Sequence, residues 1–285
     1  MSSLAQALQA AAGRIIYHES HDQAGNASYR VGDNTVYSAR TIQTAVNGTL
    51  NGNRDWAEAR CRVVCALTLL APGIPMFFMG EEVGAKEPYH YNDWLHHRED
   101  FRTLRATSGA KLFGFYRDVI RLRRQHAALR SPHVEVLHVH DANRVLVFRR
   151  WLGRSEFLVF ASLNNTHFAD GYRISHHALR YGAFMEVFNS DSTAYGGGGV
   201  TNTGRLISTG GALNVRLPAN GVLVFQRIAT GFASVLFKMI TLTLARWARR
   251  FLERREQDKP LMYDVMIAVM AVFIRHLRRR GNGRG

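Results

Sequence analysis

Two acidic segments directly follow β-type runs, and their side chains are the ones in this sequence best suited to chemistry on a polar substrate. Residues 14–18 lead into Glu19-Ser20-His21-Asp22, and the apolar run 74–79 ends in Gly80-Glu81-Glu82. An apolar run without alternation is typical of a strand buried on both faces in a parallel sheet. Reacting groups in parallel α/β folds lie at the carboxyl ends of the strands. His21, Asp22, Glu81 and Glu82 are therefore the first candidates, with Glu81 and Glu82 alternatively being solvated loop acids.

The segments around these candidates predict the helices that position them. Residues 3–12 are helix formers that end at Gly13, and polar, Gly/Asn-rich sequence up to Asn53 predicts a long loop with one helical turn. A helix is expected from Asp55 to the Pro72-Gly73 stop, with an apolar stripe of Trp56, Ala59, Val63, Ala66, Leu67 and Leu70. Another is expected from about Ala110 to Leu129, with Arg121, Arg123 and Arg124 mostly facing solvent.

After Pro132 the apolar period changes from helical to alternating. Short runs that read as strands occur at residues 134–139, 144–148, 157–160, 185–188, 213–217 and 222–225. Asn220-Gly221 predicts a tight turn before the last of them. Several short strands separated by turns indicate a small antiparallel β domain.

Four segments resemble parts of α-amylase-family enzymes, in the family's order along the chain. Glu19-Ser20-His21-Asp22-Gln23 resembles the motif on the seventh barrel strand, and is especially similar to that of α-1,4-glucan branching enzymes. Residues 71–82 resemble the eighth strand, residues 113–124 the last barrel helix, and residues 217–225 the closing hairpin of the C-terminal β domain. The resemblance covers roughly residues 3–228.

The resemblance implies the fold class and the domain organisation. Residues 1–131 are expected to form the last two strands and helices of a (β/α)8 catalytic barrel. Residues 132–228 are expected to form an antiparallel β-sandwich domain. Residues 229–285 lie beyond the family pattern and are expected to form a basic helical extension.

By resemblance, the reaction is a retaining one on α-1,4-glucan, as in glycogen and starch metabolism. The position of Asp22 implies the carboxylate that stabilises the oxocarbenium-like transition state. His21 is implied as a hydrogen-bond donor to the bound glucose, and Glu19 as a residue lining the same subsite. No metal or cofactor is implied.

The departure from the family concerns the two main catalytic carboxylates. A retaining enzyme needs a nucleophile and an acid/base about 5–5.5 Å apart, and no segment here resembles the strands that carry them. A closed barrel takes about 200–250 residues, and two parallel strands cannot close one. We therefore expect the chain to be inactive by itself, as a degenerate fragment or as one completed by a separately encoded N-terminal half. Branching and hydrolysis both stay open as the ancestral reaction.

Composition limits the other functions. The net charge is +15, of which residues 232–285 carry +8, so the remainder is only moderately basic and does not predict nucleic-acid binding. Cys61 and Cys65 lie four residues apart in a helical pattern without a second ligand pair, which favours buried thiols over a metal site. The N-terminus lacks a signal-peptide pattern, which favours the cytoplasm.

Two non-enzymatic hypotheses remain beside the enzyme fragment. The β domain could bind carbohydrate without catalysis through aromatic residues such as Trp151, Phe168 and Tyr195, although aromatic side chains in strands more often belong to a core. The tail has an amphipathic stripe between Phe232 and Leu244 and an uncharged run of ten residues at 265–274. Ten residues are too few to span a bilayer, which needs about 20. Three alternatives stay open for the tail. It could contact an anionic membrane surface, dock on protein or have no selected role.

Overall fold

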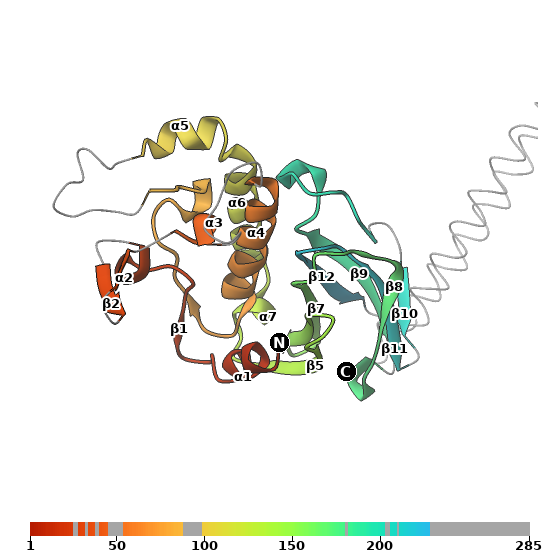
Figure 1. Ribbon diagram of the computed structural model, residues 1–285. Coiled ribbons are helices and arrows are strands. Elements are labelled where there is room, and N and C mark those ends of the chain that lie inside the picture. Colours follow the sequence, from red (N-terminus) through yellow and green to blue (C-terminus); the bar gives the residue numbers. More distant parts are fainter. Residues whose placement is uncertain are drawn as a thin grey trace, which may run out of the picture. The chain divides into compact units, whose positions relative to one another are not determined.

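A computed structural model of the chain describes residues 1–24, 28–31, 34–37, 40–44, 54–87, 99–179, 182–202, 206–209 and 211–228 (Figure 1). All of these belong to one compact unit, Met1–Ala229. The expected helical extension at 229–285 lies outside the described residues. Within the described residues, no helix combines the length and apolar character needed to cross a membrane.

The first part of the chain is mainly helical. Its elements are α1 (Ser2–Gln9), β1 (Ile15–Ile16), α2 (His21–Ala24), β2 (Ser28–Val31), β3 (Asn34–Tyr37), α3 (Thr41–Thr44), α4 (Arg54–Leu70), β4 (Ile74–Pro75), the 3-10 turn η1 (Glu81–Val83), α5 (Phe101–Ala106), α6 (Ala110–Gln125) and α7 (Ala127–Arg130). The helix α4 agrees with the apolar periodicity except at Trp56, which is 50% exposed. The helix expected from 110 to 129 is divided at His126, whose backbone is extended, into α6 and α7. The segment expected to be a long loop differs, because β2 and β3 pair as an antiparallel hairpin within it.

Strands β1 and β4 form a parallel pair with Ile15 opposite Ile74 and Ile16 opposite Pro75. The pairing agrees with the expectation of parallel strands, but β4 is shorter than the apolar run 74–79. Gly73 lets the chain enter β4 closely beside β1, since a Cβ on it would lie 2.5 Å from the Arg14 carbonyl oxygen. Neither strand has a second neighbour among the described residues. Both Ile15 and Ile74 are consequently about 60% exposed (59% and 61%).

The second part of the chain is an antiparallel β domain, as predicted. Its strands are β5 (Val134–His140), β6 (Val145–Leu152), β7 (Ser155–Ser162), β8 (Phe168–Ser175), β9 (Gly182–Asn189), β10 (Leu206–Thr209), β11 (Ala212–Leu217) and β12 (Gly221–Ile228). Six of them form one sheet in the order β10-β9-β12-β7-β6-β5, and β11 pairs with β8 in a second. The 3-10 turns η2 (His177–Leu179) and η3 (Thr193–Tyr195) lie in the connections.

The six-stranded sheet is buried on both faces, so its strands contribute to two cores. Val145 and Val147 of β6 pack toward β8 and β11, in a core that also holds Ile174 and Leu213. The alternate residues Leu146 and Phe148 belong to the core formed with α1, α4, α6 and α7. Side chains alternate between the faces of a strand, so one strand joins the helical part to the second sheet. Figure 1 shows α4 beside the strands of the β domain, and α6 packs against α4.

One basic side chain expected in solvent is instead part of this core. Arg123 is 9% exposed, and its guanidinium donates to the carbonyl oxygens of Leu69, Ala71, Gly73 and Leu129 at 2.7–2.9 Å. Three of these acceptors lie in the last turn of α4 or just after it, and Leu129 lies in α7. Carbonyls at the end of a helix lack helical partners, and a cation is favourable there. The prediction for Arg123 was therefore wrong, while Arg121 and Arg124 are exposed.

Candidate functional site

His21 and Asp22 lie at the start of α2, just after the carboxyl end of β1. The His21 Nε2 and Asp22 Oδ1 atoms are 3.1 Å apart, and both side chains are open to solvent (61% and 73% exposed). The Asp22 backbone N–H donates to Ser20 Oγ at 3.1 Å, which turns the chain at this point. The structure thus presents an accessible carboxylate and an accessible imidazole side by side.

Glu19 has the opposite environment, although it is only three residues from Asp22. Its side chain is 4% exposed, and its Oε2 lies 3.2 Å from Nε of Arg40, which is itself 2% exposed. The Thr41 backbone N–H, at the first residue of α3, donates to Glu19 Oε1. Arg40 also donates to the Met79 carbonyl oxygen at 2.8 Å. Glu19 therefore links the segment that carries His21 and Asp22 to α3 and, through Arg40, to the segment after β4.

Glu81, the other candidate acid, is also buried rather than solvated. Its Oε1 accepts from the Phe78 backbone N–H at 2.7 Å. Its Oε2 accepts from the Tyr116 hydroxyl of α6 at 3.2 Å and lies 3.0 Å from His18 Nε2. His18 lies two residues after the end of β1, and Glu81 follows β4. The contact between them therefore joins the carboxyl ends of the two parallel strands. The neighbouring Glu82 is partly exposed and accepts from the Gly80 backbone N–H at 2.9 Å.

Burial changes the pKa of several side chains in this part of the structure. It raises the pKa of the Glu19 carboxyl above its ordinary value, and the Arg40 guanidinium opposes this rise only in part. Burial also raises the pKa of Tyr116, so its hydroxyl stays a hydrogen-bond donor at neutral pH. Cys61 and Cys65 are buried free thiols whose pKa burial likewise raises. The prediction of buried helix thiols is confirmed.

The contact between Tyr116 and Glu81 should contribute measurably to stability. Hydrogen bonds to charged groups contribute about 1.5–3 kcal/mol, so we expect Tyr116→Phe to lower the free energy of unfolding by that amount in urea titrations. Tyr195→Phe is the matched control, because Tyr195 donates to Asp118 at 3.1 Å and that carboxylate also contacts Arg117 and Arg121. If the two variants lower the free energy of unfolding equally, the larger contribution expected of the bond between Tyr116 and Glu81 would be contradicted.

The structure also locates the aromatic side chains considered as sugar platforms. Trp151 stacks on His133 with ring centroids 5.4 Å apart, and Phe168 packs against Tyr172 at 4.8 Å. Tyr195 packs edge-on to Phe115 at 5.4 Å. Each ring therefore has an aromatic neighbour on at least one side.

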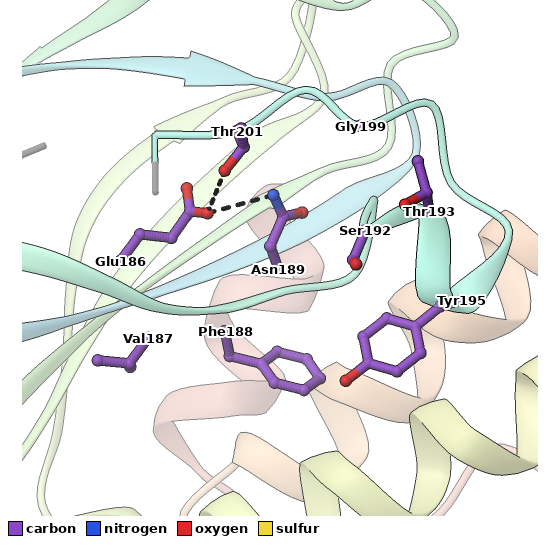
Figure 2. A pocket seen from close by; sticks show the side chains of 9 residues that line it. All are labelled: Glu186, Val187, Phe188, Asn189, Ser192, Thr193, Tyr195, Gly199 and Thr201. Carbon is purple, nitrogen blue, oxygen red and sulfur yellow. Dashed lines mark hydrogen bonds between the residues drawn. The ribbon is translucent and has the colours of Figure 1, made fainter. Parts of the chain in front are cut away.

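Tyr195 also lines a cavity of about 450 Å³ between β9 and the loop that follows it, shown in Figure 2. The Glu186 carboxylate in this cavity accepts hydrogen bonds from Thr201 Oγ1 at 2.8 Å and from Asn189 Nδ2 at 3.2 Å. It also accepts from the backbone and side chain of Asn202. These bonds hold the loop closed on the strand, so Glu186 has a structural role.

One group within the described residues has the donor types of a metal site. The ligand atoms of Glu135, His176 and His177 lie within 4.8 Å of one another on the β domain. Glu135 Oε2 is paired with Arg149 Nε at 2.5 Å. The cation beside the carboxylate works against binding a second positive charge there.

Comparison with known proteins identifies relatives of this chain. Residues 136–228 match the family described as the all-beta C-terminal domain of alpha amylase. The 1,4-alpha-glucan branching enzyme GlgB of Dechloromonas aromatica is 29% identical over 195 residues, which are 63% of this chain and 30% of that enzyme. GlgB 2 of Xanthomonas campestris pv. campestris is 34% identical over 164 residues, or 54% and 21% of the two chains. This chain thus spans less than a third of these curated relatives.

A solved structure extends the likeness to the fold. The alpha-amylase of Geobacillus thermoleovorans, complexed with acarbose, aligns with a TM-score of 0.52 at 13% identity, over 77% of this chain and 40% of that chain. At this identity the likeness concerns the fold alone. The resemblance to the C-terminal portion of α-amylase-family enzymes, and to branching enzymes within it, is confirmed.

Proposed function

We propose that this chain is the C-terminal part of an α-glucan-active retaining enzyme, most like 1,4-α-glucan branching enzyme, and that it turns over no glucan by itself. The observation that carries the proposal is the placement of Glu19-Ser20-His21-Asp22 at the carboxyl end of a strand paired in parallel with β4. Substrate sites of parallel barrels lie at this end of the strands. The similarity to curated branching enzymes supports the choice of reaction.

The proposed roles follow from exposure and charge. Asp22 offers a carboxylate to the positive character that develops at the anomeric carbon, and fixed negative charge at that position lowers the barrier. His21 donates a hydrogen bond to the bound glucose from the neighbouring position. Glu19 lies at the base of this subsite, where its buried carboxylate holds the segment that presents the other two.

The α/β portion has the surface expected of an incomplete barrel. Ile15, Tyr17, Ile74, Met76, Phe77 and Met79 are between 38% and 61% exposed on and after β1 and β4. Contiguous exposed apolar side chains on a soluble domain usually mark a surface that another element covers. We propose that this element consists of the missing barrel strands, supplied by a separately encoded N-terminal half.

The proposed organisation keeps the boundaries expected from the sequence. Residues 1–131 are the barrel portion, 132–228 the β domain and 229–285 an extension beyond the family pattern. We place the protein in the cytoplasm, where glycogen-like glucans would be its substrate. The alternative function, contact with a membrane surface, would involve this extension.

We predict that the purified chain, tested alone, causes no change in the iodine stain of amylose, because residues 1–285 contain no segment resembling the nucleophile or acid/base strands. The same assay should be run on the chain mixed with a protein that carries the preceding barrel strands. Activity only in the mixture would support a split enzyme, whereas activity of the chain alone would overturn the proposal.

A further inference from the structure

We propose a second glucan-binding site, centred on Trp56 and separate from the Asp22 subsite. Trp56 lies in the first turn of α4 and was expected in the buried stripe of that helix, yet its side chain is 50% exposed. It borders a cavity of about 230 Å³ whose other walls come from the β domain. The inference depends on the proposed function only for the choice of α-glucan as the ligand class.

The surroundings of Trp56 are mostly polar. Asp55 and Arg62 of α4, Asn165 after β7, Asp191 after β9 and Asn220 before β12 line the same cavity. An exposed ring inside a protein-docking patch normally has apolar neighbours, as Tyr17 has in the cavity that it lines with Ile15 and Val64. A ring bordered by amides and carboxylates instead suits a sugar, which offers an apolar C–H face to the ring and hydroxyl groups to the polar rim.

Arg62 is a buried cation that lines the cavity. Its side chain is 2% exposed and donates from Nη1 to the Tyr195 carbonyl oxygen at 2.9 Å. Its Nε is buried with no hydrogen-bond partner among the described residues. Because Nε is buried, a ligand in the cavity would not reach it. The bond to the Tyr195 carbonyl oxygen joins α4 to η3 and holds this wall of the cavity in place.

The remaining rim groups are held in place by the fold. Asn165 Oδ1 accepts from Arg60 at 3.2 Å and from Asn220 Nδ2 at 3.0 Å. These two bonds fix the amide plane and turn its Nδ2 donors away from both partners. Asp191 is fixed by the Gly198 and Val200 backbone N–H groups at 2.8 and 2.9 Å. Such preorganisation reduces the entropy lost when a ligand binds.

The glycine run between Asp191 and Val200 keeps the cavity accessible. Gly196, Gly197 and Gly198 line it with backbone only. At Gly197 a Cβ would lie 2.2 Å from the Asp191 carbonyl oxygen, so the tight bend of this loop requires glycine. The cavity is smaller than the roughly 300–1,000 Å³ of pockets for drug-sized ligands, which fits one sugar ring of a longer chain lying over the surface.

The test is affinity electrophoresis of the full chain in native gels that contain amylopectin, run toward the cathode because the protein carries +15. We expect amylopectin to retard the wild type and Trp56→Ala to raise the apparent Kd about tenfold, which corresponds to about 1.4 kcal/mol. Trp56→Tyr keeps a ring and should stay close to the wild type. Asn165→Ala should weaken binding about two- to tenfold, the effect of one lost hydrogen bond.

Two controls separate this site from the rest of the protein. Leu152→Ala removes another exposed apolar side chain, on β6, and should not change retardation. Asp170→Asn removes an exposed carboxylate from β8 and should bind like the wild type. No variant in this test touches the Asp22 subsite, so failure of the proposed catalytic role leaves the test intact. The proposal is overturned if the folded wild type is not retarded. It is also overturned if Trp56→Ala and Asn165→Ala migrate like the wild type; circular dichroism establishes that each variant is folded.

Discussion

Asp22→Asn should lower kcat/KM by at least about 10²–10³-fold in an enzyme reconstituted from this chain and a protein that carries the missing strands. Removing one group that stabilises transition-state charge typically has an effect of that size. The substitution is nearly isosteric, and the Asp22 side chain is 73% exposed, so the fold should tolerate it. Branch formation or release of reducing ends at saturating and limiting glucan would be measured.

The control for this prediction is another exposed aspartate. Asp170→Asn, on β8 of the β domain, removes the same charge from a surface away from the β1–β4 strand ends and should leave the rate unchanged. Assembly of the two chains is checked by size-exclusion chromatography. A rate for Asp22→Asn within tenfold of wild type, with assembly intact, would exclude the proposed role.

Arg40→Met should lower the free energy of unfolding by about 3–5 kcal/mol near neutral pH, because it leaves the buried Glu19 carboxylate without its cation. The hydrogen bond from Arg40 to the Met79 carbonyl oxygen is lost as well. Arg117→Met is the matched control. Its partner Asp118 also contacts Arg121, and Arg117 is 56% exposed, so the loss of stability there should be much smaller than for Arg40→Met.

The pH dependence should identify Glu19 as the cause. Burial already raises the pKa of Glu19 in the folded protein, so this carboxyl's contribution to stability is complete below its unfolded pKa and declines as the pH rises. Arg40 lowers that pKa, so removing Arg40 raises the pKa further and extends the decline in stability to higher pH. The difference between Arg40→Met and wild type should therefore grow as the pH is raised above about 4.5. Glu19→Gln in the Arg40→Met background should recover stability at pH 7; a pH-independent loss would contradict this origin.

The β domain was predictable because its strands alternate. Runs such as 213–217 and 222–225 lie within β11 and β12, and Asn220, with φ +42°, occupies the turn between them. The strand β8 was missed because Asp170 and Gly171 interrupt its apolar pattern. Local periodicity thus located six of the eight strands of the β domain. It missed β10 as well as β8, whose register depends on its partner β11.

The buried polar cluster could not be predicted in the same way. Glu19, Arg40 and Glu81 come from three segments without helical or alternating pattern, and charged residues in such segments are usually exposed. Only the fold brings them together, through α3 and the ends of β1 and β4. The prediction for Arg123 was wrong for the same reason. Helical spacing predicts which face of the helix carries the residue, but not which carbonyl groups lie opposite that face.

The shared sheet determines which segments of such enzymes can be exchanged by recombination. Leu146, Phe148, Val159 and Val224 form one core with Leu112 and Phe115 of α6. A crossover near residue 132 would join a β domain to helices with which it had not coevolved, and the altered core volumes would destabilise the chimera. A crossover upstream of α4 would transfer the helices and the sheet together. The segment that recombination can exchange without disturbing the core is therefore longer than the β domain alone.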